Sequence, residues 1–112
     1  MKPKTPSQLK TLQDYYDFYA AIPANKWCVD SLEDNGKCCA IGHLGLRSTF
    51  DKRPATIARL AKLINYPSDY PSPIVNVNNL SAYSIDGVNY KQKNPRARVL
   101  AYLRNKIIQR KK

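Results

Sequence analysis

The sequence lacks any long run of apolar residues, and only eight of its 112 residues are acidic. No apolar stretch approaches the roughly 20 residues that cross a bilayer, so we expect no membrane-spanning helix. The first ten residues also lack the apolar segment of a secretory signal peptide, which predicts a soluble protein of the cytoplasm. Three cysteines, an odd number, make a poor disulfide framework and fit a reducing compartment.

The length and the composition predict one folded domain. With 43% hydrophobic and 24% charged residues, the chain lies near the average of globular proteins, and it is long enough to bury one modest core. We assign residues 1–112 to a single compact domain, with residues 1–6 as a flexible leader and residues 108–112 as a frayed basic tail. The sequence contains no internal repeat.

Apolar residues that recur every three or four positions predict a mainly helical fold of the α+β class. We expect three longer helices and a short one, with a small β-hairpin at residues 26–38 packed against them. The first longer helix is predicted to be capped by Ser7 and to end at Pro23. The short helix is expected to start at Cys39, directly after the hairpin.

The second half of the chain carries the other two longer helices. One has Pro54 in its first turn and stops before the segment YPSDYPSP, which predicts a loop or an extended connector. Residues 74–77 are expected to form an extended segment or a short strand, and residues 85–90 a small turn. Asn94 is the predicted cap of the last helix, which is the longest one.

Positive charge is concentrated in the last fifth of the chain. Nineteen Lys and Arg residues outnumber eight Asp and Glu residues, which gives a formal net charge of +11. Residues 91–112 hold nine basic residues and no acidic one, whereas residues 1–90 hold ten basic and eight acidic residues. Such an uneven field attracts polyanions: nucleic acid first, then an anionic membrane surface or an acidic protein face.

The final helix is therefore the predicted nucleic-acid-binding element, because phosphate neutralisation needs only a dense row of cations on a rigid support. Tyr102 and Tyr90 are candidates for stacking on unpaired bases. The sequence contains no known reader motif, so the binding is expected to use phosphates and to tolerate any base sequence. The predicted contact residues are Arg96, Arg98, Arg104, Lys106, Arg110, Lys111 and Lys112.

One stretch, WCVDSLEDNGKCCAIGHLG, holds all three cysteines, the only histidine and the only tryptophan. Cys39 and His43 are four residues apart, so on a helix their side chains share a face. Cys28 and Cys38 complete a candidate zinc site. Structural zinc sites usually use paired Cys-x-x-Cys or His-x-x-x-His ligands, so we expect buried cysteines without a metal, and no cofactor.

An enzyme with Cys39 as nucleophile and His43 as base is a lesser alternative. A histidine four residues along the same helix seldom reaches the proton of the thiol, and no third group that orients the imidazole is evident. We therefore expect no enzymatic activity. Trp27, the single large indole, is predicted to be an anchor of the core.

Four short motifs stand out along the chain. They are Trp27, NGKCCAIG at residues 35–42, NVNN at residues 76–79 and PRARVLAYLR at residues 95–104. Together they resemble a family of small, uncharacterised bacterial and phage proteins, a domain of unknown function. Its members typically show a Trp near Gly-x-x-Cys-Ala-Leu-Gly-Ala, an Asn-Asp pair and a closing helix with Val-x-x-x-Leu. His43 and Asn79 depart from that pattern, where the family usually has Ala and Asp.

The resemblance covers about residues 25–106 and implies a fold rather than an activity. It also implies a phage- or bacterial-type accessory protein, located in the host cytoplasm or in the virion. The competing hypothesis to nucleic-acid binding is a structural or inhibitory protein that docks on an acidic partner, as a virion component or an inhibitor of host machinery. Eight tyrosines favour this hypothesis, since tyrosine and arginine are enriched at interfaces.

Overall fold

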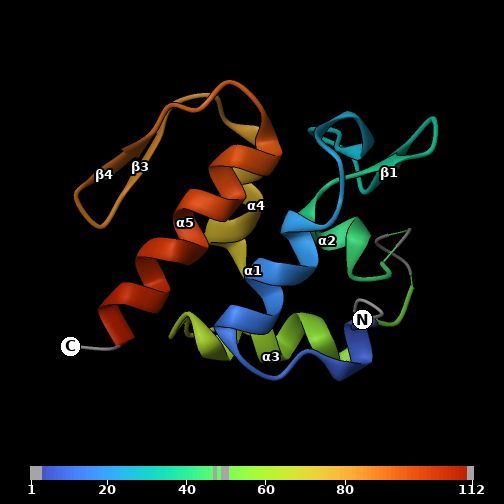
Figure 1. Ribbon diagram of the computed structural model, residues 1–112. Coiled ribbons are helices and arrows are strands. Elements are labelled where there is room, and N and C mark those ends of the chain that lie inside the picture. The colour runs from blue at the N-terminus through green and yellow to red at the C-terminus, as the bar shows by residue number, and fades with distance from the viewer. Residues whose placement is uncertain (1–3, 47, 49–50, 111–112) are drawn as a thin grey trace.

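The computed structural model describes residues 4–46, 48 and 51–110. Within these residues the chain forms five α-helices, two short 3₁₀ helices and two antiparallel strand pairs (Figure 1). The radius of gyration is 13.0 Å, close to the value of about 13 Å expected for one domain of this length. The predicted α+β class is confirmed. The predicted hairpin is present but shorter than expected, because its paired strands cover only residues 33–38. None of the described helices is long and apolar enough to span a bilayer.

The two described strand pairs are interspersed among the helices along the chain. In order they are η1 (Pro6–Gln8), α1 (Leu12–Ala20), η2 (Ala24–Lys26), β1 (Glu33–Asp34), β2 (Lys37–Cys38), α2 (Ala40–His43), α3 (Ala55–Leu63), α4 (Ser72–Asn79), β3 (Tyr83–Ile85), β4 (Val88–Tyr90) and α5 (Pro95–Arg110). Helix α5 is the longest of the described helices, and it packs against both α1 and α4 (Figure 1).

Helix α1 begins later than the sequence predicts, because a better cap lies four residues beyond Ser7. The Thr11 hydroxyl accepts a hydrogen bond from the backbone N–H of Asp14 (3.1 Å), and the Asp14 carboxylate accepts one from the N–H of Thr11 (3.1 Å). The hydrogen bond from Lys4, at 2.7 Å, is the largest of the contacts that lower the pKa of Asp14 to about 2. Lys4, in the predicted flexible leader, is therefore tied to α1.

Helix α4 is the main departure from the prediction. Residues 74–77, expected to be extended, lie inside this helix, which begins at Ser72 within the proline-rich segment. Pro73 occupies the first turn, where a missing N–H costs nothing. Ile74 and Val77 are fully buried, so the burial of this face outweighs the weak helix propensity of Val, Ile and Asn.

Helix α5 follows the prediction at its start and exceeds it at its end. The Asn94 side chain accepts a hydrogen bond from the N–H of Ala97 (2.8 Å), which confirms the predicted cap. The helix continues to Arg110, so residues 108–110 of the predicted frayed tail are helical, whereas residues 111 and 112 lie outside the described residues. The buried side chains of its inner face include Val99, Leu100, Tyr102 and Leu103.

Two hairpins carry tight turns in the left-handed backbone region. In the first, Asn35 and Gly36 have φ angles of 52° and 80°. In the second, Asp86 and Gly87 have φ angles of 55° and 78°, so the turn predicted at residues 85–90 connects a pair of three-residue strands. Both dipeptides belong to the small group that adopts this geometry with little strain.

Candidate functional site

Arg98, a predicted nucleic-acid contact, is buried and binds the end of α4. Its side chain donates hydrogen bonds to the carbonyl oxygens of Val77 (2.7 Å), Asn78 (2.8 Å) and Gln92 (2.8 Å), and the residue is only 3% exposed. A cation is favourable at this position because the negative end of a helix dipole lies at its last carbonyls. The prediction that Arg98 contacts nucleic acid is therefore wrong, because the side chain is buried and each of its three guanidinium nitrogens donates to a carbonyl oxygen of the protein.

Two further arginines of α5 bind the ends of other helices. Arg96 donates to the carbonyl oxygens of Ala20 (2.7 Å) and Ile22 (3.0 Å), at the end of α1. Arg110 donates to the carbonyl oxygen of Leu63 (2.8 Å), the last residue of α3. Helix α5 thus places one arginine at each of the C-terminal ends of α1, α3 and α4.

The other two predicted contact residues within α5, Arg104 and Lys106, differ in exposure and in pairing. The Lys106 ammonium lies 2.8 Å from the Asp86 carboxylate, so its charge is neutralised within the molecule. Arg104 is exposed, and within the described chain no carboxylate or carbonyl pairs with its guanidinium. Lys111 and Lys112 lie outside the described residues.

The two tyrosines predicted to stack on bases are buried. Tyr90 is 3% exposed and Tyr102 is 1% exposed, and their rings pack edge to face with 5.6 Å between centroids. The Tyr90 hydroxyl also accepts a hydrogen bond from the Asn105 side chain (3.0 Å). Burial raises the pKa of both phenols above the ordinary value. The prediction that these rings stack on bases is therefore wrong.

Three exposed lysines lie instead around the N-terminal end of α5. Lys91 and Lys93 immediately precede the helix, and Lys26 belongs to η2, which contacts α5 (Figure 1). None of the eight carboxylates, all of which the structure describes, pairs with these lysines. Residues 18–29 and 87–112 contain no Asp or Glu, so this end of the molecule carries uncompensated positive charge.

The cysteines are buried or partly buried, as predicted. Cys38 and Cys39 are each 6% exposed, and Cys28 is half-buried, with its thiol donating to the Ser31 (3.3 Å) and Lys37 (3.5 Å) carbonyl oxygens. Burial is the main cause that raises the pKa of the Cys28 thiol. No group of three or more His, Cys, Asp or Glu side chains in the described ranges could hold a metal ion.

Cys39 and His43 have separate surroundings. The Cys39 sulfur caps α2 by accepting a hydrogen bond from the N–H of Gly42 (3.4 Å), and it lines a pocket of about 400 Å³. His43 is not among the described residues that line this pocket, and its ring packs against the Trp27 ring with 4.8 Å between centroids. Trp27 is 5% exposed, which confirms it as a core anchor.

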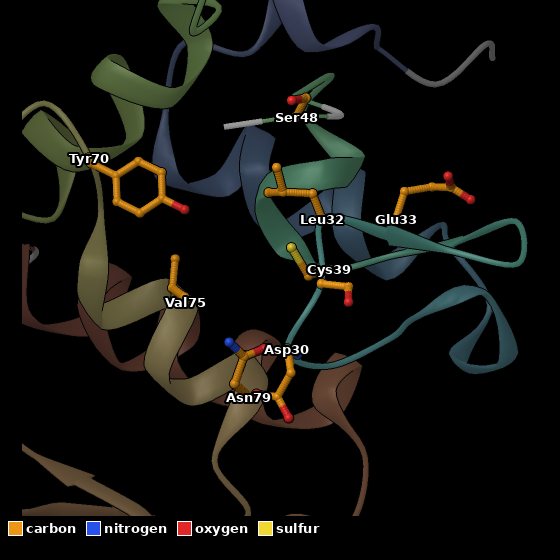
Figure 2. Close-up of a pocket in the computed structure, with 9 residues that line it drawn as sticks. Asp30, Leu32, Glu33, Cys39, Ser48, Tyr70, Val75 and Asn79 are labelled. Atoms are coloured by element: carbon orange, nitrogen blue, oxygen red, sulfur yellow. Dashed lines mark hydrogen bonds between the residues drawn. The ribbon is translucent and has the colours of Figure 1, made fainter. Parts of the chain in front are cut away.

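The pocket beside Cys39 lies between α2, α4 and residues 30–33 (Figure 2). The Cys39 sulfur, the Tyr70 hydroxyl and the Asn79 amide nitrogen face its interior, whereas the Glu33 side chain points away from it (Figure 2). Burial raises the pKa of the Tyr70 phenol, so the hydroxyl keeps its proton. The pocket therefore gathers polar groups from three separate parts of the chain.

Two adjacent asparagines hold the walls of this pocket together. Asn78 is fully buried; its side chain accepts a hydrogen bond from the N–H of Ala40 (3.0 Å) and donates one to the Cys28 carbonyl oxygen (3.0 Å). The Asn79 side-chain oxygen accepts from the N–H of Asp30 (3.0 Å) and from the Asn78 amide (2.8 Å). Since both contacts need an acceptor, the oxygen and the nitrogen of the Asn79 amide are fixed in their positions.

Sequence reasoning missed Tyr70 and Asn79 as possible site residues. It placed Tyr70 in a proline-rich connector and noted Asn79 only as a departure from a family motif. The neighbouring asparagines were the one available signal, because asparagine is uncommon inside a short apolar helix unless its amide has partners. No spacing rule links either residue with Cys39, which lies more than 30 positions earlier in the chain.

Comparison with protein-family models, with curated proteins and with solved structures found no match to this chain. The resemblance to the family of uncharacterised bacterial and phage proteins therefore stays a prediction, and the fold and the sites are interpreted from their own geometry.

Replacing Arg98 with methionine should strongly destabilise the protein. The substitution keeps an apolar stem of similar length but removes the donor from three carbonyl oxygens, and two of these hydrogen bonds, to Val77 and Asn78, are buried. Each buried unsatisfied acceptor costs about 1–3 kcal/mol. We expect the free energy of unfolding, measured by urea denaturation, to fall by about 3 kcal/mol or more. The matched variant Arg104→Met, on the exposed face of α5, should change it by at most about 0.5 kcal/mol. Equal effects of the two substitutions would contradict the capping role.

A side chain at Gly42 should distort the pocket, because a Cβ built there overlaps the Leu32 carbonyl oxygen. We expect Gly42→Ala to lower the free energy of unfolding by about 1–3 kcal/mol, the usual cost of overpacking, and to shift the NMR signals of α2 and the pocket. At Gly36 an added Cβ meets no atom within 4 Å, so Gly36→Ala should perturb only the turn between β1 and β2. Unchanged pocket signals in Gly42→Ala would refute this packing.

Proposed function

We propose that this protein binds nucleic acid electrostatically, through phosphate contacts at the N-terminal end of its final helix. The observation that supports the proposal most directly is the set of three exposed lysines there, Lys26, Lys91 and Lys93, which have no carboxylate partner. The final helix, which the sequence predicts as the binding element, remains part of the proposed site. The contact surface lies at its N-terminal end, because the lysines there form no ion pair within the protein, whereas Arg96, Arg98 and Arg110 bind carbonyl oxygens.

The charge of the whole molecule supports an anionic partner. The described residues include all eight acids but form only three salt bridges, in which Lys4, Arg53 and Lys106 take part. An ion pair removes one positive and one negative charge together, so the net charge of +11 stays on the molecule. A field of one sign steers polyanions toward the surface and concentrates them there, and phosphate contacts release counterions.

Helix geometry adds a local reason to choose the N-terminal end of α5. This helix has 16 residues, and the N-terminal end of a helix carries a partial positive charge that favours phosphate groups. Lys91 and Lys93 extend from the segment directly before it, so both charges lie close to that end. The opposite end lacks this favourable dipole, and Arg110 there is bonded to α3.

A salt series with two matched variants tests the proposal. The first variant changes Lys26, Lys91 and Lys93 to Glu, and the second changes three exposed cations elsewhere to Glu. These controls are Lys10, Lys62 and Arg104. Both variants have the same net charge, so a difference in affinity for a fluorescent single-stranded DNA oligonucleotide reports the position of the binding surface.

We expect the first variant to bind at least about tenfold more weakly and the control to be clearly less affected. The slope of log K against log salt should become shallower by about 0.7 for each phosphate of the single strand that the variant no longer neutralises. Equal weakening in both variants would reject the assigned end of α5, and an unaltered affinity would reject electrostatic binding. Tighter binding to poly-L-glutamate than to DNA would support the competing hypothesis, an acidic protein partner.

A further inference from the structure

The pocket beside Cys39 plays no part in phosphate binding and has the features of a separate ligand site. Its volume of about 400 Å³ falls in the range of about 300–1,000 Å³ that is usual for small-molecule pockets. Leu32 and Val75 supply apolar walls, and the Cys39 sulfur supplies a polarizable surface at the base (Figure 2).

The polar groups in the pocket are mainly donors. The Asn79 oxygen is occupied by the Asp30 N–H and the Asn78 amide, so the group left facing the pocket is the Asn79 amide nitrogen with its two N–H bonds. Neither this nitrogen nor the Tyr70 hydroxyl has a hydrogen-bond partner among the residues that the structure describes. A ligand that satisfies both groups must present an acceptor, and a carbonyl oxygen, which has two lone pairs, can accept from both at once.

Charge narrows the class of ligand further. In a protein with 19 Lys and Arg residues, the described lining of this pocket includes none of them. Transfer of an anion from water into a pocket whose described lining offers no cation is unfavourable. The acceptor oxygen therefore belongs to an uncharged group, not to a carboxylate or a phosphate.

We propose that this pocket binds a small uncharged molecule whose carbonyl or carboxamide oxygen accepts hydrogen bonds from the Asn79 amide and the Tyr70 hydroxyl. The apolar part of the ligand contacts Leu32 and Val75, and a ring of the size of benzene fits the available volume. The site is independent of the proposed phosphate surface, because the pocket lining includes none of Lys26, Lys91 and Lys93.

Three probes of the same size and different charge test this inference: benzamide, benzoate and benzylamine. Binding is followed by changes in the backbone amide signals of α2, α4 and residues 30–33 in two-dimensional NMR spectra of the isotope-labelled protein. Benzamide should bind with a Kd on the order of 1 mM, which is typical for a ligand of this size. Benzoate and benzylamine should each bind at least about tenfold more weakly, because the first is an anion and the second lacks the acceptor.

Substitution of Asn79 by aspartate provides a sharp test. Asn79→Asp keeps an oxygen for the Asp30 and Asn78 contacts and replaces the N–H bonds in the pocket with a carboxylate oxygen. We expect benzamide binding to weaken by about tenfold and benzylamine to become the preferred probe. Asn76→Asp, on the same helix but outside the pocket lining, adds the same charge and should leave the order of the probes unchanged.

Tyr70→Phe removes only the second donor and keeps the ring on which the Arg53 guanidinium stacks at 4.7 Å. It should weaken benzamide binding by about fivefold and leave benzylamine binding unchanged. The inference is overturned by stronger binding of benzoate than of benzamide. It is also overturned if benzamide causes no change near the pocket at about 10 mM, or if its binding survives both Asn79→Asp and Tyr70→Phe. The phosphate-binding proposal is unaffected by any of these results.

Discussion

The guanidinium of Arg98, buried against the last carbonyls of α4, is the interaction on which the other contacts of this fold depend. It is a cation without a carboxylate partner, and it is stable there because three carbonyl oxygens and the negative end of a helix dipole replace water. By fixing the end of α4, it also fixes Asn78, whose side chain binds the start of α2 and the segment before β1. One buried charge therefore holds α5, α4, α2 and the first hairpin in a single arrangement.

The same principle explains why a helix rich in arginine presents few free cations. Arg96 and Arg98 lie in the first turn of α5 and Arg110 at its last residue, and each meets the C-terminal end of a different helix. Arginine suits this task because its planar group donates several hydrogen bonds at once and stays charged when partly buried. Because these three guanidinium groups bind carbonyl oxygens of other helices, they are not available to an external partner of α5. Exposed lysines without a carboxylate partner, such as Lys26, Lys91 and Lys93, carry the charge that is still available to a polyanion.

The pocket beside Cys39 is a consequence of this arrangement of α4. The end of α4 is held from one side by Arg98, and its asparagines reach the other way, where Asn79 meets Asp30 and faces the cavity. Leu32 lies close against α2 because Gly42 has no side chain there. Residues 77–79 at the end of α4 thus both receive the Arg98 hydrogen bonds and form part of the pocket wall. A substitution that displaces this segment is expected to alter both.

The sequence by itself determined the class of the fold, the cap of the last helix, the turns of both hairpins and the burial of Trp27 and the cysteines. Local patterns are enough for these features, since periodic apolar residues, Asn-Gly and Asp-Gly turns and an Asn-Pro helix start act over a few residues. Only the tertiary structure decided that residues 74–77 are helical, that Arg98, Tyr90 and Tyr102 are buried, and that Tyr70 and Asn79 face Cys39. These outcomes depend on which distant segment covers a side chain, and the spacing of residues along the chain does not contain that information.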